Sequence, residues 1–372
     1  MPHLSALSRF ANARTLKLFL CGAARPLGLN SVLLRTPWRR RRLLILAYHG
    51  VSQHDEHNWH PDLYITPALL RRRMEILQNA RCNVLPLDKA VRLLAANELP
   101  PRSVCITFDD GTCDFYTQAF PILQSFGFPA TVYLTTYYSE FNRPIYDPVV
   151  RYMLWKSRER TVFWPEVFGS HAGFSPTGDA SFIRDRMRSY PAERGLGGRE
   201  KDALLARFAE LLKVDYDEII ARRLMHIMNP AEIRELAAKG VDFQLHTHRH
   251  GVSRQKALFD REIADNRQRL QSFGISNPGH FCYPGGVHRP EFLPWLRESG
   301  ILSATTCEPG LATPSSDPLL LPRIIDTSGM TDGEFISWVS GTGSLLPTRR
   351  YVESKGQFLE DRLRPKALAA IA

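Results

Sequence analysis

An unbroken apolar run, LLILAY at Leu43–Tyr48, constrains the fold of this chain more than any other feature. A run without polar alternation is typical of a strand that is buried on both faces. Strands of this kind form parallel sheets, and helices cover both faces of such sheets. The first expectation is therefore an α/β protein.

Strand-like and helix-like segments alternate along the rest of the chain. Pro67–Ala80 carries a helical apolar stripe, and Thr117–Phe126 is a second expected helix. The further strand candidates are Asn83–Leu87, Ser103–Phe108, Ala130–Leu134, Val241–Leu245, Phe281–Tyr283, Leu302–Thr306 and Leu319–Ile325. This alternation predicts a (β/α) barrel or a doubly wound sheet, with enough strands to close or nearly close a barrel.

The alternation divides the chain into three parts. Residues 43–345 form the predicted barrel, and residues 1–42 and 346–372 are an N-terminal arm and a C-terminal tail. Between about 146 and 228 the pattern changes to a basic, aromatic region with a glycine-rich stretch at Gly195–Gly198. We expect this region to be an insertion that is helical at both ends.

The formal charge of +10 is concentrated in the arm. Its basic residues all precede the first acidic residue, Asp55, and are Arg9, Arg14, Lys17, Arg25, Arg35 and Arg39–Arg42. Such an arm is compatible with a solvated segment, with peripheral contact to anionic lipid headgroups, or with nucleic acid. Nucleic acid is the least favoured partner, because no nucleic-acid-binding motif accompanies the arm.

The chain shows no clear signal peptide or membrane-spanning segment. Residues 15–34 are interrupted by Lys17, Arg25 and Pro26, which is too broken for a spanning helix or a secretory core. The six cysteines include no CxxC pair, so we interpret them as reduced thiols. A cytoplasmic location follows, with membrane association through the arm left open.

Polar residues follow four of the predicted strands. His49 follows the first strand, Asp109-Asp110-Gly111 the third and His246–His250 the strand Val241–Leu245; Tyr283-Pro284-Gly285 ends a fourth. In parallel α/β barrels the carboxyl ends of the strands meet at one rim, where active sites form. These residues are therefore expected to converge.

His246 and His250 are spaced so that both can face the same way on a helical turn. With a carboxylate from Asp110 they would complete a three-ligand set for Zn²⁺ or a similar divalent ion, with one position open for water. Clustered histidines are often only solvated loop residues. Their combination with a carboxylate pair at a strand end favours the metal site.

These residues together resemble the polysaccharide deacetylase family, carbohydrate esterase family four. The matching motifs are TFDDG at Thr107–Gly111, H-[ST]-x-x-H at His246–His250 and a Tyr-Pro-Gly element at Tyr283–Gly285. The resemblance extends from about Leu43 to Gly341. It implies a distorted parallel (β/α) barrel of about seven strands that removes acetyl groups from N-acetylated sugars of a polysaccharide, oligosaccharide or glycolipid.

The resemblance also implies roles for individual residues. Asp109 falls on the general base, and Asp110, His246 and His250 fall on the metal ligands, with zinc as the first candidate and cobalt, nickel or iron as alternatives. Residues Tyr283, Pro284 and Gly285 fall on an element that contacts the acetylated substrate. Removal of an O-acetyl group instead is not distinguished by the residues.

Two positions depart from the family pattern. Phe281-Cys282 stands where an arginine usually contacts the base, and Arg323 is the nearest replacement. The family's C-terminal Leu-x-His, the source of the general acid, has no counterpart, because no histidine follows His288. His49 could supply the acid instead, as in the poly-N-acetylglucosamine deacetylase branch, whose N-terminal Tyr-His plays this part; a structural rim histidine is the alternative.

Two other functions compete with this hypothesis. An aspartyl-phosphate phosphatase also has an Asp after a strand, but it needs two Asp residues that are two positions apart, and Asp109 and Asp110 are adjacent. A catalytically weak carbohydrate-binding homologue would explain the two departures. The presence of a base, three ligands and a replacement acid favours an enzyme.

Overall fold

Residues 32–159, 161–169, 173–345 and 358–362 are described by the computed structural model of this chain. The greater part of the predicted N-terminal arm, residues 1–31, lies outside the described residues. So does most of the predicted tail, at residues 346–357 and 363–372.

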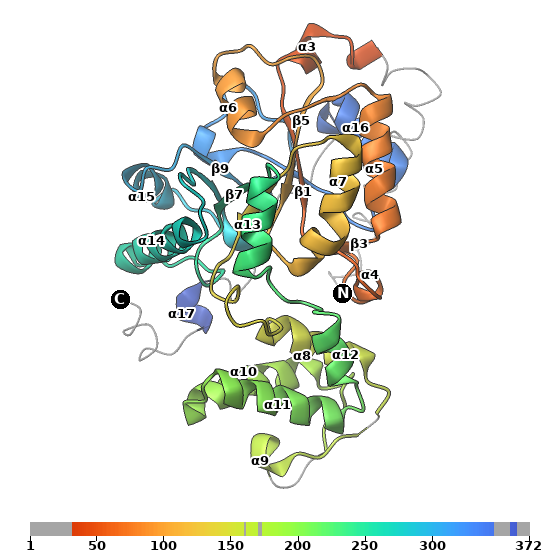
Figure 1. Cartoon of the computed structure of the whole chain (residues 1–372), viewed down its shortest axis with the longest axis vertical. Coiled ribbons are helices and arrows are strands. Elements are labelled where there is room, and N and C mark those ends of the chain that lie inside the picture. Colours follow the sequence, from red (N-terminus) through yellow and green to blue (C-terminus); the bar gives the residue numbers. More distant parts are fainter. Residues whose placement is uncertain (1–31, 160, 170–172, 346–357, 363–372) are drawn as a thin grey trace, which may run out of the picture.

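One parallel sheet forms the centre of the fold (Figure 1). Its strands are β1 (Leu44–Tyr48), β4 (Asn83–Val84), β5 (Ser103–Phe108), β6 (Thr131–Leu134), β7 (Asp242–Leu245), β8 (His280–Cys282), β9 (Ser303–Thr305) and β10 (Ile324–Ile325). They follow the order β10-β1-β5-β6-β7-β8-β9, and β4 adds to β5. The predicted distorted parallel barrel is confirmed.

Strand β1 is the second strand of this order and lies between β10 and β5. Every residue of β1 is fully buried. It pairs in parallel with β5 along its whole length, from Leu44 opposite Val104 to Tyr48 opposite Phe108. The apolar run was thus a sound indicator of a strand covered on both faces.

The two ends of the sheet approach each other through Leu321. Its N–H donates to the carbonyl of Ala304, and its own carbonyl accepts from the N–H of Thr306, both at 2.9 Å. The prediction of one continuous strand over Leu319–Ile325 is wrong. Pro318–Leu320 forms a 3₁₀ turn, and Pro322, which has no N–H to donate, separates Leu321 from β10.

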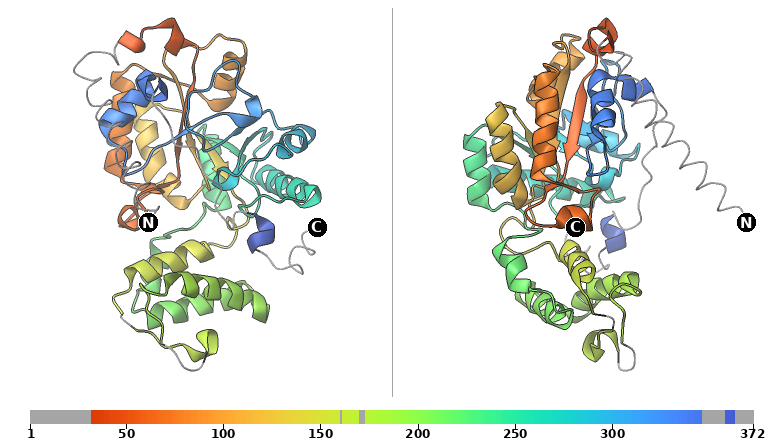
Figure 2. Two further views of the ribbon diagram at one scale, coloured as in Figure 1. Left: turned by 180° about the vertical axis from the view of Figure 1, so that it is seen from behind. Right: turned by 90° about the vertical axis from the view of Figure 1, so that its right-hand side faces the viewer.

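Helices surround the sheet, as the two views of Figure 2 show. They are α5 (Pro67–Asn79), α6 (Leu87–Ala95), α7 (Phe120–Phe126), α13 (Pro230–Ala238), α14 (Lys256–Ser272), α15 (Phe292–Glu298) and α16 (Asp332–Ser340). Local sequence explains several starts: the side chain of Thr66 caps α5, and Asn229 with Glu232 forms a capping box on α13. None of the helices in the described ranges is long and apolar enough to cross a bilayer.

Short elements complete the barrel. They are α3 (Pro37–Arg40), β2 (Gly50–Val51), α4 (Glu56–Trp59), β3 (Tyr64–Ile65), the π-helical turn η1 (Phe115–Ala119), η2 (Pro284–Gly286), η4 (Thr342–Leu345) and α17 (Leu359–Arg362). In α3, Arg39 is fully buried and donates to the carbonyl of Val339 at 2.9 Å. This residue of the basic run is therefore part of the packed structure and not of a solvated arm.

A layer of helices lies below the sheet in Figure 1. They are α8 (Tyr146–Lys156), α9 (Pro165–Phe168), α10 (Ala180–Arg194), α11 (Gly198–Leu211) and α12 (Tyr216–Ala221). These helices bury an apolar cluster of their own, centred on residues such as Met153, Met187 and Phe208. Figure 1 places them at the same end of the molecule as α4 and α17.

The chain leaves this helical layer beside the turn that follows β5. The N–H of Met228 donates to the carbonyl of Gly111 at 3.0 Å, and the N–H of Cys113 donates to the carbonyl of His226 at 2.8 Å. These two bonds form a short antiparallel bridge. The helical layer is thereby tied directly to the segment that carries Asp109 and Asp110.

Candidate active site

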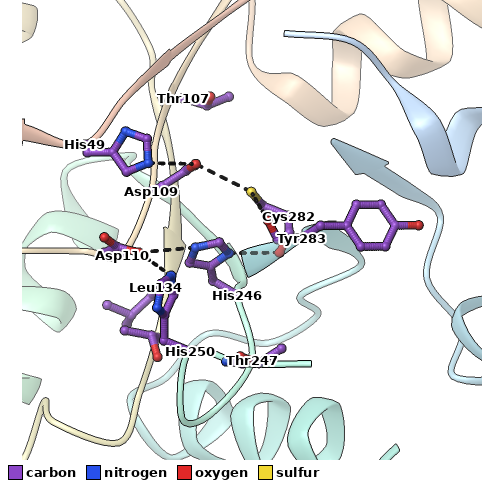
Figure 3. A network of polar contacts seen from close by, with 12 residues as sticks. His49, Thr107, Asp109, Asp110, Leu134, His246, Thr247, His250, Cys282 and Tyr283 are labelled. Carbon is purple, nitrogen blue, oxygen red and sulfur yellow. Dashed lines mark hydrogen bonds and ion pairs between the residues drawn. The ribbon is translucent and has the colours of Figure 1, made fainter. Parts of the chain in front are cut away.

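The rim at the carboxyl ends of the strands collects the predicted polar residues (Figure 3). His49 follows β1, Asp109 follows β5, His246 follows β7 and Cys282 ends β8. Their polar side chains come from segments that are far apart in sequence, and the parallel order of the strands brings them together. The expected convergence at one rim is thus present in the fold.

A tight turn separates the two adjacent carboxylates. The N–H of Asp109 donates to the carbonyl of Tyr48 at 2.8 Å, which continues the sheet pairing past the end of β5. Asp110 and Gly111 then adopt the left-handed backbone conformation, at φ +67° and +79°. At Gly111 a Cβ atom would come within 2.1 Å of Cδ1 of the buried Leu134, so a larger residue would have to displace that side chain and would also strain the backbone.

Asp110 faces two imidazole nitrogens. Its Oδ1 lies 3.2 Å from Nε2 of His246 and 3.0 Å from Nε2 of His250. This oxygen is buried and has no contact of hydrogen-bond geometry with any residue that the structure describes. The ligand atoms of Asp110, His246 and His250 all lie within 4.8 Å of one another, which is close enough to hold one metal ion.

The ring of His246 is oriented by a second contact. Its Nδ1 lies 2.8 Å from the carbonyl oxygen of Cys282, which can only accept a hydrogen bond, so Nδ1 carries the proton. In the neutral ring this leaves the lone pair of Nε2 directed toward Asp110. In metal sites, the ring nitrogen of a histidine that does not bind the metal usually donates a hydrogen bond to such an acceptor.

The electrostatics of these three residues favour an added positive charge. Burial alone would raise the pKa of Asp110, but the two imidazoles hold it well below its usual range. Burial opposes protonation of His246, yet Cys282 and the surrounding carboxylates raise its pKa well above 6.5. One carboxylate and two histidines suit a divalent cation such as zinc. Its positive charge would replace the proton that His246 otherwise binds.

The loop that holds both histidines is not a helical turn, so that part of the prediction is wrong. Thr247 and His250 have positive φ angles, of 61° and 53°. The hydroxyl of Thr247 accepts the N–H of Gly251 at 3.0 Å, which stabilises this irregular loop. A tight loop brings His250 back beside His246, where one helical turn had been expected.

Asp109 makes a bidentate ion pair with Arg323. Nη1 and Nη2 of the arginine lie 2.7 Å from the two carboxylate oxygens, and both side chains are almost fully buried. Burial would raise the pKa of Asp109, but the charge and hydrogen bonds of Arg323 lower it to about 2. The arginine that the sequence left uncertain therefore contacts this carboxylate.

Cys282 completes the surroundings of the ion pair. Its Sγ accepts a hydrogen bond from Nη2 of Arg323 at 3.0 Å and lies 3.5 Å from Oδ2 of Asp109. Asp109, His246 and Cys282 also form a cluster of potential metal ligands. Because the guanidinium already contacts both Asp109 and Cys282, the cation of this second cluster is Arg323 itself.

His49 lies on the other side of Asp109. Its Nε2 is 3.8 Å from Oδ2 of Asp109, and its Nδ1 has no hydrogen-bond partner in the described part of the chain. About a fifth of its side chain is exposed. Burial lowers the pKa of His49, and Asp109 and Asp110 partly offset this effect.

The Tyr283-Pro284-Gly285 element lies deeper than a substrate contact requires. Tyr283 is fully buried, and its hydroxyl donates to the carbonyl of Leu319 at 3.0 Å. Pro284 is also buried, whereas Gly285 is partly exposed at φ +59°. The phenol ring of Tyr283 is thus part of the core. A substrate contact from this element stays a prediction, and of its three residues only Gly285 is exposed enough to make one.

His248 lies between the two ligand histidines in sequence but contacts a different part of the fold. Its Nδ1 lies 2.9 Å from the hydroxyl of Thr136, and burial lowers its pKa to about 4.

Asn266 of α14 was missed by the sequence reasoning. Its Oδ1 accepts the N–H of His246 at 2.9 Å, and its amide donates to the carbonyl of Leu134 at 3.0 Å. An asparagine within the apolar stripe of α14 was the available signal.

A family model and a relative of known sequence both place this chain among the polysaccharide deacetylases. A model described as polysaccharide deacetylase matches residues 96–169 and 216–303, and the gap between these ranges contains the helices α10 and α11. YxkH of Bacillus subtilis (strain 168), which is named as a polysaccharide deacetylase, is 30% identical over 303 residues, covering 80% of this chain and 76% of that protein. This match is longer than the two ranges of the family model together.

A shorter match concerns the poly-beta-1,6-N-acetyl-D-glucosamine N-deacetylase of Escherichia coli (strain K12). It is 31% identical over 104 residues, which are 27% of this chain and only 15% of that protein. Among solved structures, Streptococcus pyogenes deacetylase PplD in complex with acetate has a TM-score of 0.53 at 18% identity, covering 80% of this chain and 98% of that chain. At this identity the likeness concerns the fold alone.

Proposed function

The chain belongs to the polysaccharide deacetylase family, and from this premise we propose that it is a metal-dependent hydrolase that removes acetyl groups from N-acetylated sugars. The substrate is a polysaccharide, an oligosaccharide or a glycolipid. The single observation that carries the proposal is the arrangement of Asp110 Oδ1, His246 Nε2 and His250 Nε2, in which the carboxylate oxygen lies about 3 Å from each nitrogen.

Asp110, His246 and His250 would hold the divalent cation. When bound, such a cation acts as a Lewis acid on the acetyl carbonyl and makes water a better nucleophile. Zinc is the first candidate, and cobalt, nickel or iron suit the same donors. The carbonyl of Cys282 and the amide of Asn266 would keep His246 in the tautomer and orientation that binding requires.

Asp109 is the proposed general base. It would accept the proton of the water that attacks the acetyl carbon. Arg323 keeps this carboxylate ionised and fixes its orientation, while the free lone pairs of its oxygens remain available for the proton. Because a bidentate guanidinium pair fixes the plane of the carboxylate, the direction of proton transfer is fixed as well.

His49 is the proposed general acid. It would donate a proton to the sugar nitrogen as the carbon–nitrogen bond breaks. This proton is needed because a neutral amine is a far better leaving group than the deprotonated nitrogen anion. Its position on the opposite side of Asp109 from Cys282 is compatible with a proton passing from base to acid. The products are acetate and a free amino group on the sugar.

A catalytically weak carbohydrate-binding homologue is the alternative. It would need neither an ionised Asp109 nor a buried arginine directed at it. Burial of such an ion pair costs desolvation energy, and a pair that only stabilised the fold could be replaced by apolar side chains. The pair therefore supports turnover.

The substrate class is tested by measuring acetate release from a panel of acetylated glycans. Poly-β-1,6-N-acetylglucosamine is the first member, because the Escherichia coli relative is named for it. Oligosaccharides, a lipid-linked N-acetylated sugar and an O-acetylated glycan complete the panel. Release from the O-acetylated glycan alone would contradict the proposed N-deacetylation.

A cytoplasmic location of the protein stays a prediction.

A further inference from the structure

The C-terminal segment, Phe358–Arg362, returns to the loop that carries His250. Phe358 forms a parallel bridge with Val252, and the N–H of Leu359 donates to the carbonyl of Val252 at 2.9 Å. Val252 lies two positions after His250. Figures 1 and 2 show α17, within this segment, at the end of the barrel that faces the helical layer.

Glu360 binds the same loop through its carboxylate. Its Oε1 accepts a hydrogen bond from the hydroxyl of Ser253 at 2.5 Å and another from the N–H of Arg254 at 2.9 Å. The Ser253 oxygen in turn accepts the N–H of Gln255 at 2.9 Å. Ser253 is fully buried, so one carboxylate oxygen organises the turn between His250 and the start of α14.

Phe358 joins two rim loops. The guanidinium of Arg254 lies 3.6 Å from the centre of its ring, and that of Arg289 lies 5.3 Å from it. Arg254 belongs to the loop of the ligand histidines, and Arg289 belongs to the loop that follows β8. Phe358 and Leu359 are each only 1% exposed. The segment is therefore packed against both loops and is not a surface extension.

The loop of the ligand histidines needs external support. Thr247 and His250 hold left-handed backbone conformations, which are unfavourable for residues other than glycine. The bond from Gly251 to Thr247 is local. His248 and Arg249 are bound to Glu262 of α14, which fixes the part of the loop before His250. The part that follows His250 is held by its contacts with the C-terminal segment.

We propose that the C-terminal segment is a clamp that positions His250 for metal binding, with Glu360 and Phe358 as its positioning residues. The clamp rests on the proposed function only in that His250 is a metal ligand. It acts by holding the loop in the conformation that brings Nε2 of His250 to Asp110. Removing the clamp lets the loop relax and separates His250 from the other two ligands.

The test compares Glu360→Ala with Glu360→Gln in the full chain. Alanine removes the acceptor of both hydrogen bonds, whereas the amide oxygen of glutamine keeps it. Phe358→Ala is the second variant, and Leu94→Ala, in the buried face of α6 at the far end of the barrel, is the control for a general loss of stability. The probe is Co²⁺ alone, with its affinity measured by chelator competition and its coordination by visible absorption.

We expect Glu360→Ala and Phe358→Ala to weaken Co²⁺ binding by about tenfold, as is common when a contact that orients a ligand is lost. Glu360→Gln should stay within about twofold of the parent. In the metal-free protein, amide hydrogen exchange of the peptide over 246–252 should accelerate in Glu360→Ala. This second readout needs neither metal nor turnover.

Two outcomes would overturn the clamp. One is unchanged Co²⁺ affinity and unchanged exchange over 246–252 in both clamp variants. The other is an equal loss of affinity in Leu94→Ala at a matched loss of thermal stability. A parent protein that binds no Co²⁺ would contradict the proposed metal site instead, and exchange in the metal-free protein would still decide the clamp.

Discussion

Arg323 donates a hydrogen bond to each carboxylate oxygen of Asp109, at 2.7 Å, from a position 214 residues away along the chain. The same guanidinium donates to Cys282, to the hydroxyl of Thr107 and to the carbonyl of Thr306. Its five N–H groups are thus all used inside the barrel. These contacts hold the guanidinium of Arg323 against Asp109, which explains how the buried carboxylate of Asp109 stays ionised.

Arg323→Lys should impair the base and spare the metal. Lysine cannot reproduce the bidentate contact, so the orientation of Asp109 is lost and its pKa rises from about 2 toward the usual range. We expect kcat to fall by about 100-fold, as in other losses of a single oriented charge contact. The acidic limb of the pH–rate profile should move to higher pH, because the base must be ionised. Metal content should not change.

Substitutions of the two adjacent carboxylates should have different consequences. Asp109→Asn should abolish turnover while the protein still binds one metal ion, since Asp109 is assigned as the base. Asp110→Asn should lose the metal, because a neutral amide is a much poorer ligand than a carboxylate. Metal analysis and acetate release on the same preparations check both. The reverse pattern would exchange the two assignments.

His49→Ala should show a dependence on the leaving group. Hydrolysis of an N-acetylated sugar needs a proton on the leaving nitrogen, and loss of the acid should slow it by about 100-fold or more. Hydrolysis of 4-nitrophenyl acetate, whose phenolate leaves without a proton, should change by less than about threefold. Equal losses on both substrates would assign His49 to a step before bond cleavage.

Asp114 predicts a pH dependence of stability. Its Oδ1 accepts the N–H of Val51 at 3.1 Å, and burial raises its pKa to about 7. Because this pKa is above the unfolded value of about 3.9, the contribution of this group to stability is fully present below about pH 4 and is lost as the pH rises through about 7. A difference of one pH unit between the folded and unfolded pKa corresponds to about 1.4 kcal/mol of unfolding free energy.

Asp114→Asn removes this charge and keeps an acceptor for Val51. The metal-free variant should therefore unfold at a higher temperature than the parent at pH 8, by a margin that disappears near pH 4. Thermal unfolding across this pH range measures the effect. A constant difference between the two proteins would show that Asp114 is not protonated in the fold.

The basic arm predicts salt-sensitive attraction to anionic vesicles. Deletion of residues 1–31 removes Arg9, Arg14, Lys17 and Arg25 and leaves the buried Arg39 in place. Each basic residue near such a surface contributes about 1 kcal/mol, so vesicle cosedimentation at low salt should fall markedly. Equal retention of both proteins on vesicles, or stronger binding to duplex DNA, would contradict a membrane role.

The sequence predicted the strands that position the site because their composition is dictated by burial on both faces. It also predicted that Asp109, Asp110, His246 and His250 lie together, since polar residues at strand ends meet at one rim. It could not predict that Cys282 contributes both a carbonyl to His246 and a thiol to Arg323, because a small buried cysteine needs no such role. These contacts depend on the three-dimensional position of β8.

Other features depend on long-range packing. Tyr283 matches a motif, yet its hydroxyl is used by Leu319 in the core. The loop of His250 departs from a helical turn because it is held by Thr247 and by the C-terminal segment, which lies about 110 residues further along the chain. Local periodicity contains no information about such partners.

The most direct measurement is acetate release from an N-acetylglucosamine oligomer by the parent protein, before chelation, after removal of bound metal, and after addition of one equivalent of Zn²⁺. Asp109→Asn serves as the metal-binding but inactive control. The account predicts about one metal ion per chain, loss of activity on chelation and its return with the added metal. Full activity in metal-free protein would contradict it.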